Sequence, residues 1–163
     1  MSRPANSTRA FSLIELVIVV VIIGIIGAIA IPRLSRGAVG AADGALRGNL
    51  AVMRSAIELF AAEHEGLFPG KDSSNNVEDV ATQLTGYTDV NGNPNATKTT
   101  VFIYGPYLKS VPPLPVGAEK GSTTIAAAAA AGVGWIYDSA TGAIKSNTTA
   151  GEQDAKGVKY SDY

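Results

Sequence analysis

The chain has 163 residues, a formal net charge of −1 and no cysteine. This length allows one modest domain plus an appendage, and the scattered Lys and Arg residues form no basic stripe of the kind that binds nucleic acid. The lack of cysteine excludes a disulfide framework, a thiol nucleophile and thiolate zinc sites.

The first predicted element is an apolar run from Phe11 to Ile31, preceded by a polar leader, residues 1–10, that carries Arg3 and Arg9. As an α-helix the run would extend for about 31 Å, close to the thickness of membrane hydrocarbon. The pattern therefore predicts a membrane-crossing helix. A cleaved secretory signal, which has a shorter apolar core and a small-residue cleavage site, and a plain single-pass anchor are the alternatives.

Glu15 lies near the start of this run, although a carboxylate in hydrocarbon costs about 2.5–3.5 kcal/mol. If the leader is cut between Ala10 and Phe11, the new α-amino group is largely cationic at neutral pH. An unpaired charge in apolar surroundings favours whichever arrangement supplies a partner. Glu15 is therefore a candidate for setting the register between neighbouring subunits.

The segment AFSLIEL, the apolar run and Pro32 after it resemble the N-terminus of type IV pilins and of type II secretion pseudopilins. The resemblance implies that a prepilin peptidase removes the leader on the cytoplasmic side and N-methylates Phe11, and that Glu15 guides assembly. Phe11, Glu15 and Pro32 match the family pattern. Ala10 departs from it, because Gly usually precedes the cut.

Residues 32–66 are expected to continue the helix beyond a kink or interruption at Pro32. Apolar residues recur there at spacings of four and three, which predicts an amphipathic helix with one face on the C-terminal domain. They are Leu46, Leu50, Met53, Ile57 and Phe60. Gly66 is the expected helix stop.

Gly37, Gly40, Gly44 and Gly48 recur every three or four residues along this helix. Each glycine costs roughly 0.8–1 kcal/mol of helix stability relative to Ala. Two explanations stay open: a smooth face where neighbouring helices approach closely, or a weak hinge. The resemblance favours the hinge, because pilin-like filaments melt near the proline.

Residues 67–163 are expected to form a small α+β domain with a polar tail. The predicted elements are a short helix capped by Asn76, turns over 86–100, a strand over 100–104 and a hairpin of Val133–Asp138 and Ala143–Ser146. The alanine run 126–131 is either a helical turn or a link. The predicted fold class is α+β, with a long N-terminal helix packed on a small antiparallel sheet.

The C-terminal segments GLFPG, YGPYLKSVPPLP and GWIYDSATG resemble parts of the major type II secretion pseudopilin. The resemblance implies a calcium site near the C-terminal loop, for which Asp154 and Asp162 are weak candidates. The turn DVNGN lacks the full ligand series of a calcium loop. His64 is expected at a solvated helix end, with no metal or catalytic role.

These features predict a structural subunit, not an enzyme, that resides in the bacterial inner membrane and then in a filament. The implied partners are further copies, other pilin-like subunits, the prepilin peptidase and an inner-membrane assembly platform, with no nucleic acid. No cofactor is expected, apart from the calcium candidate. A type II secretion pseudopilin is favoured. The alternatives are a surface pilin for adhesion, motility or DNA uptake, and a non-polymerising membrane-anchored binding domain.

Overall fold

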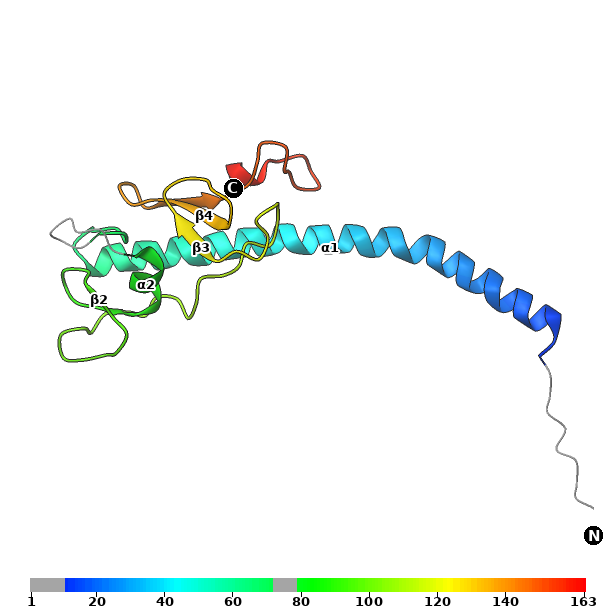
Figure 1. The fold of residues 1–163 in the computed structure, drawn as a ribbon, viewed down its shortest axis with the longest axis horizontal. Helices are drawn as coiled ribbons and strands as arrows, with labels where there is room; N and C mark the ends of the chain where they lie inside the picture. The colour runs from blue at the N-terminus through cyan, green and yellow to red at the C-terminus, as the bar shows by residue number, and fades with distance from the viewer. Residues whose placement is uncertain (1–10, 72–78) are drawn as a thin grey trace, which may run out of the picture. The chain divides into compact units, whose positions relative to one another are not determined.

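The computed structural model describes residues 11–71 and 79–163, and for residues 30–38 the backbone alone. The chain divides into two compact units, Met1–Ala38 and Val39–Tyr163. The longest element is helix α1, Leu13–Glu63, and it is followed by short strands and loops (Figure 1). The arrangement is α+β, which confirms the predicted fold class.

In the second unit, α1 supplies one wall of the hydrophobic core. All five residues of the predicted stripe are at most 1% exposed: Leu46, Leu50, Met53, Ile57 and Phe60. They pack in one cluster with side chains from the sheet, the loops and a second, short helix, among them Leu84, Leu114, Trp135, Tyr137 and Ile144. The prediction that this face of the helix is buried is confirmed.

Helix α1 ends at Glu63, and the chain turns away through two residues with positive φ, Glu65 at 55° and Gly66 at 88°. The Gly66 amide donates to the carbonyl oxygen of Ala61 at 2.7 Å, as in a glycine-terminated helix. The prediction of a helix stop at Gly66 is confirmed.

The larger sheet has the strand order β3-β4-β5. The strands β4, Val133–Asp138, and β5, Ala143–Ser146, form the antiparallel hairpin over the predicted residues. β3, Thr124–Ala126, pairs with β4 in parallel. The sheet is therefore mixed where an antiparallel sheet was expected, and the start of the alanine run belongs to a strand.

A second, two-stranded sheet pairs β1, Tyr87–Thr88, with β2, Pro94–Asn95. The strand expected over residues 100–104 is wrong, since only Tyr104 forms an isolated bridge, to Thr88. The hydroxyl oxygen of Thr99 accepts bonds from the amides of residues 101 and 102, so a local turn replaces extended pairing.

The short helix α2, Val80–Thr85, begins three residues later than expected. Asp79 caps it, because its carboxylate accepts a bond from the Thr82 amide at 3.0 Å. The predicted cap at Asn76 is therefore wrong, and Asn76 itself lies outside the described residues. The chain ends in a single 3-10 turn, η1, Tyr160–Asp162.

Candidate functional site

The N-terminal part of α1 places Glu15 in its first turn. The carbonyl oxygen of Ser12 accepts bonds from the amides of Glu15 and Leu16 at 3.1 and 3.2 Å. The carboxylate lies at the end of the helix where the macrodipole is positive, which favours an anion. This placement stabilises the charge only in part, so Glu15 still favours a cationic partner.

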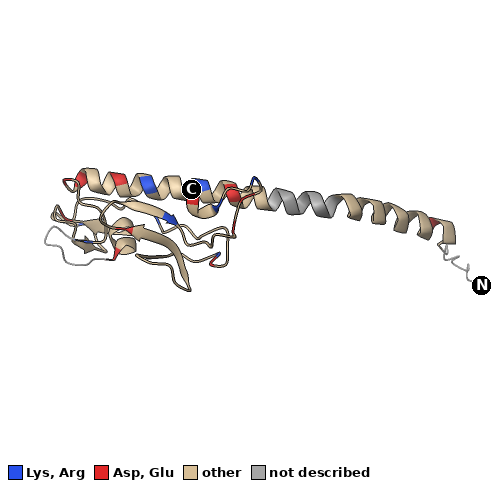
Figure 2. Ribbon diagram, turned by 90° about the horizontal axis from the view of Figure 1, so that it is seen from above, with Lys and Arg blue, Asp and Glu red and all other residues tan. Residues whose placement is uncertain are grey.

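The side chains from Phe11 to Ile29 are apolar almost without exception, and they are exposed around the whole helix. Phe11 and Leu13 are 78% and 80% exposed, and the valines and isoleucines that follow are exposed by 45–64%. Figure 2 shows this stretch without a charged position after Glu15. Such a surface needs hydrocarbon or other apolar helices to cover it.

A membrane-crossing helix was expected over residues 11–31. Within the described residues, no helix combines the length and the apolarity that a membrane crossing requires.

The glycines of α1 have open space beside them. A Cβ atom added at Gly40, Gly44 or Gly48 would meet nothing within 4 Å. The second unit therefore gives no steric reason for glycine at these positions. Pro32 and Gly37 lie in the stretch described by its backbone alone, where α1 continues without a break.

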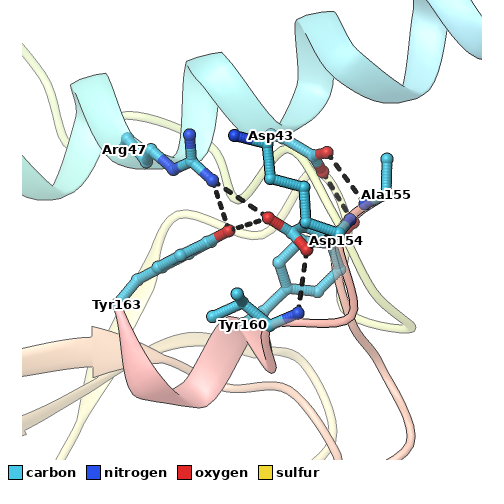
Figure 3. A network of polar contacts seen from close by, with 8 residues as sticks. Asp43, Arg47, Asp154, Ala155, Tyr160 and Tyr163 are labelled. Carbon is cyan, nitrogen blue, oxygen red and sulfur yellow. Dashed lines mark hydrogen bonds and ion pairs between the residues drawn. The ribbon is translucent and has the colours of Figure 1, made fainter.

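A polar network joins α1 to the C-terminal segment (Figure 3). Arg47 donates to the Asp154 carboxylate at 3.0 Å and to the Tyr163 phenol oxygen at 2.5 Å, and its guanidinium lies 4.7 Å from the Tyr163 ring centroid. Tyr163 also donates to Asp154. Its hydrogen bond and those from the backbone hold the pKa of Asp154 below its usual range.

The same segment is tied to α1 at a second point. Tyr160 donates to the buried carboxylate of Asp43 at 2.7 Å, and the amide of Ala155 donates to the other oxygen at 3.4 Å. Burial and the Asp43 hydrogen bond raise the pKa of Tyr160 to about 12. The polar tail expected at the end of the chain is thus anchored on the helix.

The calcium candidates lie in this segment. Both oxygens of Asp154 already accept bonds from proton donors, namely Arg47, Tyr163 and the amides of Lys156 and Val158. Asp162 is exposed, and its carboxylate accepts a hydrogen bond from the Ser161 hydroxyl. Within the described residues, no group of three or more acidic, histidine or cysteine side chains could hold a metal. This donor set does not fit calcium.

His64 is not at a solvated helix end. It is 2% exposed, and both of its ring nitrogens lie within hydrogen-bond distance of carbonyl oxygens, those of Phe60 and Asp89. Sequence reasoning missed this burial, because the flanking glutamates indicate a solvated surface.

Residues 5–31 match the family model of the prokaryotic N-terminal methylation motif. The chain carries a prepilin-type methylation motif. The match concerns the N-terminal segment alone, and it supports the resemblance of this segment to type IV pilin-like proteins. Neither the curated proteins nor the solved structures contain a match to the chain.

The motif covers the predicted processing and assembly residues Ala10, Phe11 and Glu15. Ala10 lies outside the residues that the structure describes, while Phe11 and Glu15 lie at the start of α1. The contacts of Arg47 with Asp154 and Tyr163 span more than 100 positions, and no local pattern in the sequence indicates them.

Proposed function

We propose that this chain is a subunit of a type IV pilus-like filament and, within that class, a pseudopilin of type II secretion. The observation that carries the proposal is the methylation motif at residues 5–31, on a helix whose apolar side chains are exposed on all sides. Hydrocarbon and a bundle of like helices are the two environments that cover such a surface, and a filament subunit uses them in turn.

In this proposal, residues 11–31 cross the inner membrane and residues 67–163 lie outside the cytoplasm. Cleavage between Ala10 and Phe11 creates a cationic amino terminus, which N-methylation leaves able to carry its charge. Glu15 of one copy then pairs with Phe11 of its neighbour as helices leave the membrane for the filament. Each step adds one copy, and the assembly platform supplies the site of addition.

The narrower assignment to secretion depends on the segments GLFPG, YGPYLKSVPPLP and GWIYDSATG, which resemble the major pseudopilin. The lack of cysteine agrees with it, because many adhesive pilins close the C-terminal loop with a disulfide. In this chain the C-terminal segment is held instead by hydrogen bonds to Asp43 and Arg47.

The assembly role of Glu15 is tested by Glu15→Val against the matched control Glu58→Val, which removes an exposed carboxylate farther along the same helix. Glu15→Val should be processed and retained in the membrane but absent from sheared or cross-linked filaments, whereas Glu58→Val should still be incorporated. Equal incorporation of the two variants would contradict the proposed pairing. Filaments absent even for the unaltered chain would indicate an anchored domain that does not polymerise.

A strain from which this chain has been deleted distinguishes a function in secretion from a function in surface pili. A pseudopilin predicts that secreted enzymes accumulate inside the cell envelope while surface filaments persist in normal number. A loss of surface filaments with normal secretion would assign the chain to the surface pili instead. Complementation with the unaltered chain, and not with Glu15→Val, is the control in either case.

A further inference from the structure

The C-terminal segment, residues 154–163, carries a buried carboxylate. The side chain of Asp154 is 1% exposed, and a carboxylate that leaves water is stable only when it is paired and hydrogen-bonded. The cation that faces it is Arg47 of α1, at 3.0 Å, with half of its own side chain exposed. The other kind of cation that holds carboxylates in proteins is a metal ion, and the resemblance to pseudopilins implies calcium in this region.

The lone pairs of the Asp154 carboxylate are all directed at hydrogen atoms. One oxygen accepts from the amides of Lys156 and Val158, at 2.8 and 2.9 Å. The other oxygen accepts from the Arg47 guanidinium and from the Tyr163 phenol. A carboxylate has about four acceptor sites, and four donors fill them. Calcium needs six to eight oxygens that each offer a lone pair to the ion, so this carboxylate has none left for it.

The carbonyl oxygens of the loop that follows Asp154 also accept hydrogen bonds from within the protein. That of Asp154 accepts from the Gly157 amide at 3.0 Å, and that of Val158 accepts from the Asp154 amide at 2.8 Å. The carbonyl oxygen of Tyr160 accepts from the buried hydroxyl of Ser146 at 2.8 Å. The loop is therefore closed by its own hydrogen bonds and needs no ion to gather its oxygens.

Asp43 of α1 is the second buried carboxylate beside this segment, and its oxygens are occupied in the same way. One accepts from the Tyr160 phenol at 2.7 Å and the other from the Ala155 amide at 3.4 Å. Asp43 lies one helical turn before Arg47, on the same side of α1, so the positive charge of the guanidinium attracts both carboxylates (Figure 3). One arginine thus compensates the two buried charges at this joint.

The contacts of Tyr163 require the shape of a guanidinium as well as its charge. Arg47 donates to the Tyr163 phenol oxygen at 2.5 Å and lies 4.7 Å from the centroid of the same ring. A second arginine, Arg54, donates to the main-chain oxygen of Tyr163 at 2.5 Å. A planar fork of donors can bond an oxygen and stack on a ring at once, which a spherical metal ion cannot do.

From these contacts we infer that Arg47 is the built-in cation of the second unit, which fastens residues 154–163 to α1 in the place of a calcium ion. Asp154, a calcium candidate by resemblance, is the partner of this arginine instead. The joint therefore depends on one side chain of α1 and is independent of calcium. The inference concerns the second unit alone and does not rest on filament assembly, so the two can fail separately.

The first test is amide hydrogen exchange of the full chain in detergent micelles, with calcium chloride and with a calcium chelator. The Val158 amide reports on the joint, because it donates to the Asp154 carboxylate. Its exchange rate should be the same in both solutions. Slower exchange of this amide in calcium than in the chelator would overturn the inference. This measurement needs no variant, so it stands even if substitution at Arg47 prevents folding.

The second test compares Arg47→Met, which keeps an apolar stem, with the matched control Lys156→Met, which removes an exposed cation from the C-terminal segment itself. Exchange of the Val158 amide should be about tenfold faster in Arg47→Met, the effect of losing one hydrogen bond to a charged group, and unchanged in the control. Arg47→Lys should exchange more slowly than Arg47→Met, because it keeps the charge. Equal rates in Arg47→Met and Lys156→Met would overturn the inference.

Discussion

The loops of the second unit are closed by carboxylates that accept bonds from backbone amides. Asp138 accepts from Ala140, Glu152 accepts from Ala118 and Thr149, and Asp154 accepts from Lys156 and Val158. These bonds stabilise the ionised form of each carboxyl group. Single residues thus hold segments that have little regular secondary structure of their own.

This pattern predicts loss of stability in acid. The pKa is lowered by the Thr141 side chain for Asp138, by the Thr149 amide for Glu152 and by the Tyr163 phenol for Asp154. Because the folded-state pKa lies below the unfolded one, the stabilisation is present at neutral pH and is lost as the pH falls through the lowered values. The unfolding temperature should therefore drop steeply below ~pH 4, near the ordinary carboxyl pKa.

Asp154→Asn is the informative variant for this prediction, and Asp162→Asn is its control, since Asp162 is exposed in the same segment. Asp154→Asn should lower the unfolding temperature at neutral pH and flatten its dependence on acid. Circular dichroism at several pH values measures both effects. Parallel curves for the two variants would show that the Asp154 bonds contribute nothing.

Gly142 ends the hairpin loop at a φ of +72°, and a Cβ there would lie 2.5 Å from the Phe68 ring. Gly121 has a φ of +94° with open space beside it. Both Gly→Ala variants carry backbone strain, but only Gly142→Ala also forces two groups together. We expect it to be less stable than Gly121→Ala by about 1–3 kcal/mol. Urea unfolding measures the difference, and equal losses would mean that Phe68 simply moves aside.

At the scale of elements, α1 has two kinds of surface. Beyond Ala38 one face is buried in the core, whereas the first turns expose apolar side chains on every side. Helix propensity alone does not explain Gly40, Gly44 and Gly48, because alanine would be the better helix former at each position.

The variant Gly44→Ala distinguishes the effect of this glycine on the stability of the helix from its effect on filament assembly. Since nothing lies within 4 Å of the added Cβ, the variant should stabilise the second unit by about 0.8–1 kcal/mol, the helix-propensity difference. If the glycines serve a hinge or a close contact between copies, filament assembly or extensibility should nevertheless decline. Unfolding of the subunit and shearing of filaments measure the two effects. Unchanged assembly would leave the glycines without either role.

At the scale of the whole molecule, processing is the property that decides the class of protein. Intact-mass and N-terminal fragment spectrometry of the membrane-extracted chain should show a start at Phe11 and the mass of one added methyl group. Ala10→Gly should be processed faster, since glycine usually precedes the cut in the type IV pilin-like proteins that this segment resembles. A chain that still starts at Met1, in cells whose peptidase processes other substrates, would remove the amino-terminal partner that the proposal gives Glu15.

Local patterns predicted the parts of the fold that depend on neighbours along the chain. The spacing of Leu46, Leu50 and Met53 predicted the buried face of α1, and the Ser-Ala-Thr-Gly loop between two strand-like segments predicted the hairpin. The expected strand at residues 100–104 failed because the hydroxyl of Thr99 competes for its amides. Strand β3 was missed because its three residues, Thr124–Ala126, are too few to show an alternation of apolar and polar side chains.

The sequence by itself determined the methylation motif, the long helix with its apolar first half, and the hairpin, because each is encoded in consecutive residues. Only the tertiary structure decided which distant side chains meet. The Gln83 side chain accepts a hydrogen bond from the Gly70 amide and donates to the carbonyl oxygens of Lys71 and Gly92. Arg47 donates to Asp154 across 107 positions. His64 is enclosed between Phe60 and Asp89. A polar side chain carries no local mark of its partner, since burial and pairing depend on segments that the fold brings together.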